Sequence, residues 1–355
     1  MFGGSANAKT NLKNLTFGEQ SSLIKKLGEP AFRARQISKW LYVKRCCDIE
    51  KMTNLSKSLR DKLSEKYCAD GLVTVEKMKS EDRVIKYIFG LSDGLYAVET
   101  VYIPEEKRGT VCLSTQVGCR FACLFCATGR QGFKRNLTLG EILNQIVEVQ
   151  NDPEAGTVTH VVIMGMGEPL DNFDVVVEAL TIMNSKDGFG IGKRRITLST
   201  VGLAPEIRRL GELDLDVNLA VSLHSADDEI RSRLLSVNKK YPVSELMKAC
   251  REFPLKPQRK ITMEIVLFDG VNDSPTDAKK LIKALHGVRA KVNLIRLNRV
   301  ESCSLIPSPA DKMADFKERL LTARIPVTIR KSRGGDIRAA CGQLGKTPPT
   351  PVKIP

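Results

Sequence analysis

Three cysteines that lie within eight residues are the strongest chemical feature of the sequence. Cys119, Cys123 and Cys126 have the spacing C-x-x-x-C-x-x-C, directly after Gly118. A structural zinc site takes four tetrahedral ligands, usually from a second cysteine pair or a histidine pair. The sequence offers neither beside this triplet, and its three histidines are far apart. Three thiolates suit a four-iron cluster in which one iron keeps an open position, so the triplet favours iron–sulfur over zinc.

Two cysteines outside the triplet also bear on chemistry. Cys112 comes seven residues before Cys119, inside an apolar run, and Cys341 lies in the glycine-rich, arginine-flanked run Arg333-Gly-Gly-Asp-Ile-Arg-Ala-Ala-Cys341. From the residues alone, the simpler interpretation is a small buried side chain for Cys112 and an inert loop thiol for Cys341. Five further cysteines have no matched role, and we expect them to be structural: Cys46, Cys47, Cys68, Cys250 and Cys303.

The segment after Gly109 contains the elements that must position these residues. Short apolar runs alternate there with longer helical stretches, a pattern that predicts a parallel sheet with right-handed crossovers. The expected fold class is therefore α/β, a partial (β/α) barrel. The predicted strands are residues 110–117, 160–166, 195–201, 217–223, 261–268, 292–297 and 327–330.

Small and polar residues stand at the ends of these predicted strands. In barrels of this kind, the working residues lie where strands end and loops begin, at the carboxyl face. The residues at these ends are Cys119, Gly167, Glu168, Ser199, Ser222, His224 and Asn298. The sequence therefore predicts a catalytic site at one end of the barrel.

The chain before the barrel has a different pattern. Residues 16–67 are amphipathic with helical spacing, and residues 73–103 are typical of strands with turns at 80–82 and 92–94. The polar first residues and the proline-rich tail favour disorder. We expect four parts: a disordered N-terminus at 1–13, a small, mainly helical accessory domain at 14–95, the barrel at 96–345, and a disordered tail at 346–355.

The charge of the chain indicates a polyanionic partner. Fifty-six Lys and Arg residues against forty-one Asp and Glu residues give a formal charge of +15. Nucleic acid is the expected partner, and a merely soluble basic protein is the alternative. We expect no membrane contact, because no apolar run is long enough to cross a bilayer. The start of the chain lacks the apolar core of a secretory signal, so a cytoplasmic protein with reduced thiols is expected.

The combined motifs resemble a known family. C-x-x-x-C-x-x-C with an aromatic residue before its last cysteine is the signature of radical S-adenosylmethionine (SAM) enzymes. Between about Phe32 and Leu344, five runs are similar to the RlmN/Cfr-type adenosine methyltransferases. They are Cys112-Leu-Ser-Thr-Gln-Val-Gly-Cys119, Gln131-Gly-Phe-Lys-Arg-Asn-Leu137, Met164-Gly-Met-Gly-Glu-Pro-Leu170, Ser222-Leu-His224 and Gly335-Asp-Ile-Arg-Ala-Ala-Cys-Gly-Gln343.

This resemblance implies a fold, a reaction and cofactors. It implies a barrel of the radical SAM type that methylates carbon 2 of adenosine in 23S rRNA and, in the RlmN branch, in tRNA. The cofactors would be SAM and a [4Fe-4S] cluster on Cys119, Cys123 and Cys126, with flavodoxin or ferredoxin as an electron donor. Gly167 and Glu168 match the position that binds the SAM amino group. Further SAM contacts are matched by Ser199, Ser222, Leu223, His224 and Asn298.

The resemblance also implies roles for three other residues. Cys341 would take a methyl group from one SAM and become S-methylcysteine, and a radical from a second SAM would couple that carbon to adenine. Cys112 would resolve the protein–RNA crosslink by forming a disulfide with Cys341, and Glu99 matches the proton acceptor. RNA docking on the accessory domain is expected of a set of basic and aromatic residues: Arg33, Arg35, Lys39, Trp40, Tyr42, Lys44 and Arg45.

Two alternatives remain at this point. The Cfr branch methylates carbon 8 with the same cysteines; the Gly167-Glu168-Pro169 run and the N-terminal domain favour carbon 2. A non-catalytic iron–sulfur or zinc RNA-binding protein would explain the charge and the triplet, but it would leave Cys112, Cys341 and Glu168 without a function.

Overall fold

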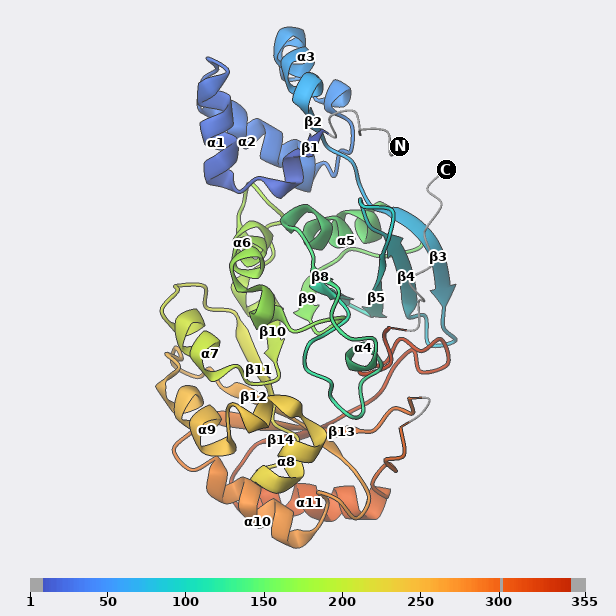
Figure 1. The fold of residues 1–355 in the computed structure, drawn as a ribbon, viewed down its shortest axis with the longest axis vertical. Helices are drawn as coiled ribbons and strands as arrows, with labels where there is room; N and C mark the ends of the chain where they lie inside the picture. The colour runs from blue at the N-terminus through green and yellow to red at the C-terminus, as the bar shows by residue number, and fades with distance from the viewer. Residues whose placement is uncertain (1–8, 301–302, 346–355) are drawn as a thin grey trace, which may run out of the picture.

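The computed structural model describes residues 9–300 and 303–345, and ten strands of these residues form one curved sheet (Figure 1). Seven neighbouring strands are parallel and follow the chain order. They are β6 (Arg108–Cys112), β9 (His160–Ile163), β10 (Ile196–Thr200), β11 (Asn218–Ser222), β12 (Ile261–Leu267), β13 (Ala290–Arg296) and β14 (Val327–Arg330). Because the sheet has open edges at β14 and β3, the barrel is partial, as predicted.

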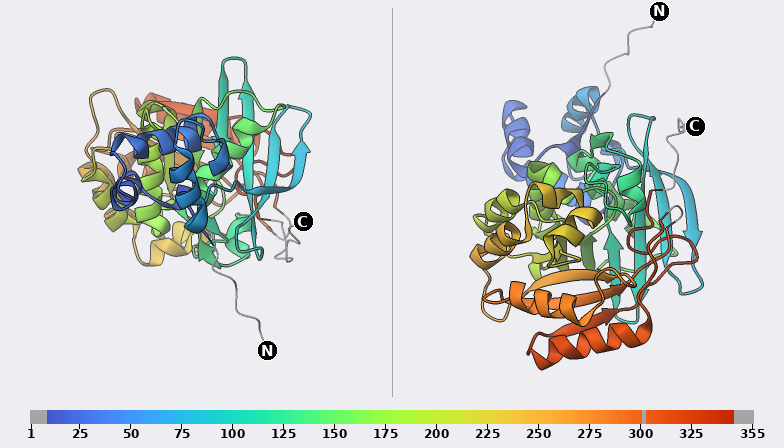
Figure 2. Two further views of the ribbon diagram at one scale, coloured as in Figure 1. Left: turned by 90° about the horizontal axis from the view of Figure 1, so that it is seen from above. Right: turned by 60° about the horizontal axis from the view of Figure 1, so that its bottom comes forward.

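Helices cover the outside of this curve, as Figures 1 and 2 show. The period-two pattern of the strands separates the two faces. In β10, Ile196 and Leu198 are fully buried, whereas Thr197 and Ser199 line the hollow inside the barrel. The helices of this region are α4 (Ala127–Arg130), α5 (Leu139–Asn151), α6 (Phe173–Asn184), α7 (Ala204–Gly211), α8 (Asp228–Leu234), α9 (Val243–Glu252), α10 (Pro275–Ala284) and α11 (Ala310–Thr322).

The first predicted barrel strand, residues 110–117, is two strands. β6 ends at Cys112, and β7 (Gln116–Val117) pairs instead with β8 (Arg135–Asn136). Between them, the Gln145 side chain accepts a hydrogen bond from the Ser114 amide at 2.8 Å and donates one to the Ser114 carbonyl at 2.9 Å. This side chain takes the place of a ladder partner, and Cys112 therefore lies at the carboxyl end of its strand.

Three antiparallel strands extend the same sheet beyond β6. They are β5 (Ala97–Glu105), β4 (Ile85–Gly90) and β3 (Val73–Lys79). The turns predicted at 80–82 and 92–94 connect them. The domain boundary predicted between residues 95 and 96 therefore falls inside the hairpin of β4 and β5, and residues 73–95 belong to the barrel sheet rather than to a separate domain.

The helical N-terminal part lies at one end of the molecule, beyond α5 (Figure 1). Thr16 caps α1 in a capping box with Glu19. The elements of this part are β1 (Thr10–Asn11), η1 (Leu12–Asn14), α1 (Phe17–Lys26), α2 (Phe32–Ser38), the π-helical η2 (Lys39–Val43), η3 (Ile49–Lys51), α3 (Lys57–Lys66) and β2 (Tyr67–Cys68). In the part of the chain that the structure describes, no helix has the length and apolar character needed to cross a bilayer.

The disorder expected for residues 1–13 is wrong at residues 9–13; residues 1–8 and 346–355 lie outside the described residues. The Lys13 side chain is fully buried, and its ammonium donates to the carbonyls of Ala69 at 2.9 Å and Asp70 at 3.3 Å. It also lies 3.5 Å from the Cys47 sulfur. The carbonyls that hold Lys13 are more than fifty residues away in the sequence, so the polar sequence around it did not predict its burial.

Replacing Lys13 by alanine should destabilise the N-terminal part. The buried Ala69 carbonyl and the partly buried Asp70 carbonyl would lose a charged donor, so the free energy of unfolding should fall by about 2 kcal/mol. Urea denaturation followed by circular dichroism measures this change. Lys25→Ala, at an exposed position on α1, should stay within about 0.5 kcal/mol of the unmodified protein; equal losses in the two variants would contradict the assignment.

Candidate active site at the carboxyl ends of the strands

A cavity of about 160 Å³ lies at the carboxyl ends of the parallel strands. Residues that are far apart in the sequence, from Cys123 to Cys341, meet in its wall. The polar residues at the ends of the predicted strands had indicated a site at this end of the barrel. The predicted site residues that line it are Cys123, Cys126, Gly167, Glu168, Ser199, Ser222, His224, Asn298 and Cys341. Four others are not among the described residues of its wall: Glu99, Cys112, Cys119 and Leu223.

The three cysteines of the triplet lie in the loop between β7 and α4. Gly118 begins this loop with a φ of +71°, and a Cβ there would meet the Gly132 carbonyl oxygen at 1.7 Å, so only glycine fits. Burial raises the pKa of Cys119 to about 12. Burial and the neighbouring thiols of Cys126 and Cys119 also raise the pKa of Cys123. Converging thiols that oppose each other's ionisation need positive charge to become thiolates, and the iron of a cluster would supply it. The donor set therefore fits a cluster.

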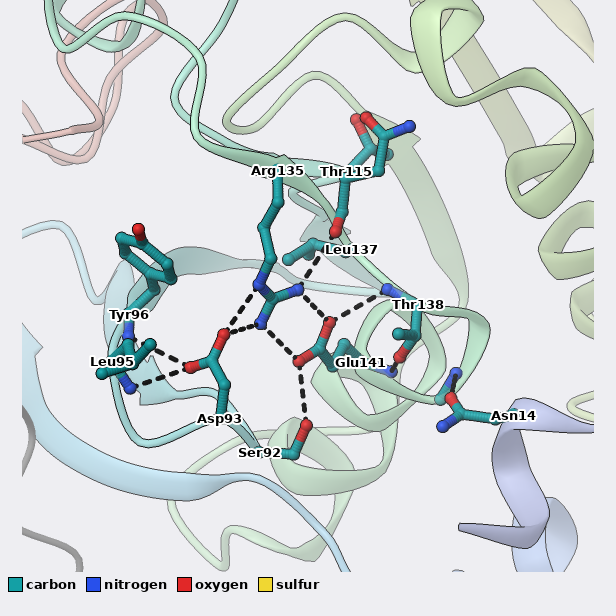
Figure 3. Close-up of polar contacts among 12 residues, drawn as sticks. Asn14, Ser92, Asp93, Leu95, Tyr96, Thr115, Arg135, Leu137, Thr138 and Glu141 are labelled. Carbon is teal, nitrogen blue, oxygen red and sulfur yellow. Dashed lines mark hydrogen bonds and ion pairs between the residues drawn. The ribbon is translucent and has the colours of Figure 1, made fainter. Parts of the chain in front are cut away.

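Figure 3 shows the polar network that fixes the base of this loop. The Arg135 guanidinium donates to both carboxylate oxygens of Glu141, at 2.8 and 2.9 Å, and to Asp93 at 2.7 Å. Glu141 also accepts from the Thr138 amide at the start of α5, and Asn14 accepts from the adjacent Gly140 amide at 2.9 Å. Bidentate pairs of this kind hold planar groups in one orientation. The network joins the loop, the β4–β5 turn and the N-terminal part.

Glu168 is a buried carboxylic acid in the wall of the first cavity. Its carboxylate oxygens accept hydrogen bonds from the amides of Val201 at 2.8 Å and Leu170 at 3.0 Å. Burial raises the pKa of Glu168 to about 7, against the opposing effect of these donors. Gly167 has a φ of +98°, and a Cβ there would lie 2.5 Å from the Gln116 Cβ. An ammonium group in the cavity would satisfy the buried carboxylate, which fits the amino group of SAM.

His224 is held neutral inside the same wall. Its Nδ1 accepts a hydrogen bond from the Val266 amide at 3.0 Å, and its ring meets the Phe125 ring edge-on with centroids 4.8 Å apart. Burial, with Arg231 nearby, lowers the pKa of His224 to about 3. Its φ of +55° turns the chain at the end of β11. His224 therefore shapes the cavity as an uncharged ring.

Arg231 is a structural residue that the sequence analysis missed. Its side chain is fully buried on α8, and it donates to the carbonyls of Leu223 at 3.1 Å and Val201 at 2.6 Å. Its third contact is the Asn238 side-chain oxygen at 2.7 Å. One guanidinium thus holds the ends of β10 and β11 together beneath the cavity. The sequence signal is weak, since Arg231 is one of two arginines in an ordinary polar helix.

Cys341 reaches the cavity on an irregular segment, residues 331–345, here called the C-terminal segment. The Asn298 side chain donates to the Cys341 carbonyl at 3.1 Å. Beside it, the Ala127 amide donates to the Gly342 carbonyl at 2.8 Å, and the Thr128 hydroxyl donates to the Leu344 carbonyl at 2.6 Å. The cluster loop and the exposed Cys341 thiol are therefore held next to each other.

A second cavity, of about 690 Å³, shares part of its wall with the first. Cys112 lines this second cavity, and Cys341, Arg330 and Met164 line both. Burial raises the pKa of Cys112 to about 12; the Cys341 thiol adds to the rise, and Arg330 opposes it. The two cysteines thus lie in one wall, close enough for the Cys341 thiol to affect the pKa of Cys112. No role was assigned to Arg330 from the sequence.

Glu99 is buried below the C-terminal segment. Its carboxylate lies 3.2 Å from the Lys86 ammonium and accepts from the Gly345 amide at 2.9 Å. Glu99 is not among the described residues that line either cavity, so its role as proton acceptor stays a prediction. The role expected for Tyr42 in RNA docking is wrong, since its ring is buried, whereas Trp40 is half-buried with the Lys44 ammonium 3.5 Å above its ring centre.

Comparison with known proteins agrees with this geometry. Residues 113–282 match the family model of the radical SAM superfamily, and residues 10–69 match that of the ribosomal RNA large subunit methyltransferase N-terminal domain. The dual-specificity RNA methyltransferase RlmN of Syntrophobacter fumaroxidans is 45% identical over 334 residues, which are 94% of this chain and 97% of that protein. The chain belongs to the RlmN family. RlmN of Geobacter sulfurreducens is 47% identical over 94% of this chain and 91% of its own length.

A solved structure supports the same assignment for the fold. A radical SAM methyltransferase from Sphaerobacter thermophilus has a TM-score of 0.88 and 41% identity, over 94% of this chain and 99% of that one. The expected radical SAM barrel is therefore confirmed, and so are a [4Fe-4S] cluster and SAM as the cofactors of this family. The N-terminal family model ends at residue 69, which agrees with the strand positions and not with a domain that extends to residue 95.

Cys123→Ala should remove the cluster while the barrel remains folded. The variant would lack one of three sulfur ligands, so it should lose bound iron, visible absorbance and dithionite-dependent cleavage of SAM to 5′-deoxyadenosine. Iron analysis and chromatography measure these losses. Cys303→Ala, a half-buried cysteine outside the loop, should keep all three properties, and full iron in Cys123→Ala would contradict the assignment.

The depressed pKa of His224 predicts a pH dependence of stability. The histidine takes up a proton at about pH 6.5 in the unfolded chain, but only at about pH 3 in the folded chain. The free energy of unfolding therefore decreases as the pH falls between these values. Between pH 6.5 and 5.0 the protein should lose about 1.5 kcal/mol more than His224→Asn. Denaturation at each pH measures the difference. His286→Asn, at an exposed position, should follow the unmodified protein; parallel curves for all three would contradict the burial of a neutral His224.

Proposed function

We propose that this chain methylates carbon 2 of adenosine in 23S rRNA and in tRNA, with Cys341 as the carrier of the methyl group. One observation carries the proposal: Cys341 stands in the wall between the cavity that holds Cys123 and Cys126 and the cavity that holds Cys112. A carrier has to meet the donor on one side and the resolving thiol on the other. The relatives at 43–47% identity are named as dual-specificity RNA methyltransferases.

Cofactor binding is assigned to residues of the first cavity. Cys119, Cys123 and Cys126 would hold the cluster, and Glu168 with Gly167 would bind the amino group of SAM. When bound, these cofactors supply the methyl group and the radical that activates it. Further contacts are assigned to Ser199, Ser222, His224 and Asn298 in the wall, and the family resemblance assigns one to Leu223.

The two thiols differ in the way that their roles require. Cys341 is exposed, so its sulfur can meet both SAM and an extruded adenine, and Arg330 lies beside it in the wall that both cavities share. Cys112 is buried with a raised pKa, which keeps it protonated until the crosslink forms next to it. It then loses its proton and attacks the Cys341 sulfur, so that a disulfide forms and the bond from that sulfur to the RNA carbon breaks; that carbon takes up a proton and becomes the methyl group. Glu99, beside Lys86, would accept the proton of the adenine ring.

RNA binding is assigned to the basic surface of the N-terminal part and to the charge of +15. The exposed side chains that remain from the predicted set are Arg35, Lys39 and Lys44, and partly exposed ones are Arg33, Trp40 and Arg45. The electron donor is proposed to be a flavodoxin or a ferredoxin. We place the reaction in the cytoplasm, where ribosomal and transfer RNA occur and where ten free cysteines would stay reduced.

Replacing Cys112 by alanine should trap the enzyme on its RNA. The steps at Cys341 would proceed, but no second thiol would remain to attack its sulfur, so the protein should accumulate as a band that ribonuclease shortens on a denaturing gel. Cys341→Ala should give neither crosslink nor product. The double variant should behave like Cys341→Ala, because the carrier is missing.

Two outcomes would contradict this assignment: normal turnover by Cys112→Ala, or a crosslink that survives the loss of Cys341. Cys250→Ala provides the matched control, since Cys250 is buried on α9 outside both cavity walls as described. It should show at most a stability loss and no crosslink.

A further inference from the structure

The second cavity extends from the two thiols toward the amino ends of the strands. Cys112 and Cys341 lie in its wall, and Thr197, Thr262 and Lys291 line it from the second position of β10, β12 and β13. With about 690 Å³ it is about four times the size of the first cavity. Small-molecule sites usually occupy 300–1,000 Å³, so a small molecule can enter this space and reach the buried side of the thiol pair.

The wall of the second cavity is positively charged. Its five cationic side chains face two acidic ones, Glu105 and Glu264. Lys291 and Lys331 are exposed at its rim. The cationic residues are Arg108, Lys291, Arg330, Lys331 and Arg333. A cleft with one dominant sign of charge concentrates small ions of the opposite sign and raises their association rate, so the cavity favours anions.

The proposed reaction requires a reduction step at the two thiols. Each turnover would end with a Cys112–Cys341 disulfide, which must receive two electrons before Cys341 can accept a methyl group again. The Cys112 side is only 8% exposed and faces the second cavity. The pair can therefore be attacked from two sides: a folded protein dithiol can reach only the exposed Cys341 sulfur, whereas a small molecule in the second cavity can reach the Cys112 sulfur.

We propose that the second cavity admits a small anionic thiol, one that carries a carboxylate, and that this thiol reduces the Cys112–Cys341 disulfide; this inference rests on the proposed function. The thiolate attacks the Cys112 sulfur, the disulfide bond breaks, and Cys341 leaves as a thiolate beside Arg330. A second thiol attacks the sulfur of the first, so that Cys112 leaves and takes up the proton. Two small thiols thus become one small disulfide, and their two electrons restore both cysteines.

The test starts from one turnover of the holoenzyme with RNA in the absence of added thiol. After ribonuclease treatment, mass spectrometry of the linked Cys112–Cys341 peptides measures the disulfide and its decay. Three thiols of similar size are compared: 3-mercaptopropionate, which is anionic, 2-mercaptoethanol, which is neutral, and cysteamine, which is cationic. Each rate is divided by the rate of the same thiol on the urea-unfolded protein, which corrects for intrinsic reactivity.

The anionic thiol should react about tenfold faster than the neutral one, with the cationic thiol slowest, and high salt should reduce the differences. Lys291→Glu/Lys331→Glu should abolish or reverse this order. Lys279→Glu/Lys283→Glu is the matched control, with the same change in net charge at exposed positions of α10, and it should keep the order.

The remaining outcomes separate this inference from the proposed function. If no disulfide forms in the first stage, the proposed function fails, and this inference fails with it. If the disulfide forms but the three thiols show equal corrected rates, only the inference is overturned. The same holds if thioredoxin reduces it faster than 3-mercaptopropionate at equal concentration, or if Lys291→Glu/Lys331→Glu weakens RNA binding but leaves the order of the thiols unchanged.

Discussion

The placement of one sulfur by an irregular segment is the constraint on which the rest of the structure depends. After β14 the chain has no further helix or strand among its described residues, yet it must hold Cys341 at the carboxyl end of the barrel. Hydrogen bonds replace regular structure: α4 binds the carbonyls of Gly342 and Leu344, and Asn298 binds that of Cys341. On the other side, Glu99 accepts from the Gly345 amide, and Lys86 donates to the Arg338 carbonyl at 3.3 Å. The extra strands β4 and β5 therefore serve the site, since they supply the Lys86 and Glu99 side chains that anchor this segment.

The difference in exposure between the two thiols follows from the same arrangement and accounts for their different roles. Cys112 ends a strand in the sheet and is surrounded by packed residues, so its thiol is protonated and protected. Cys341, on a segment held mainly through its backbone, keeps an exposed sulfur. Arg330, at the end of the edge strand, lies next to both. The same side chain, a cysteine, thus serves as the exposed methyl carrier on the C-terminal segment and as the buried resolving thiol at the end of β6.

The sequence predicted the seven parallel strands because their apolar runs alternate with helices, and it predicted most of the first cavity because polar residues end those strands. The sequence prediction was wrong where contacts with residues distant in the sequence determine the local structure. The strand at 110–117 breaks because Gln145, thirty-one residues away from Ser114, takes over its backbone bonds. Lys13 is ordered by carbonyls of Ala69 and Asp70, and the hairpin of β4 and β5 joins the barrel through a pairing that local patterns cannot reveal. The roles of Cys112, Cys341 and Glu99 came from the family resemblance, and Arg231 and Arg330 became visible only through their contacts.

The central claim is that the methyl group reaches RNA by way of Cys341, and isotope tracing tests it most directly. The enzyme is first loaded with SAM that carries a deuterated methyl group, freed of excess SAM, and then given RNA with unlabelled SAM for a single turnover. Mass spectrometry of the modified adenosine identifies the source of the new carbon. The account predicts deuterium from the preloaded Cys341 methyl in the RNA product. An unlabelled methyl group in that first product, with the label still on Cys341, would contradict it.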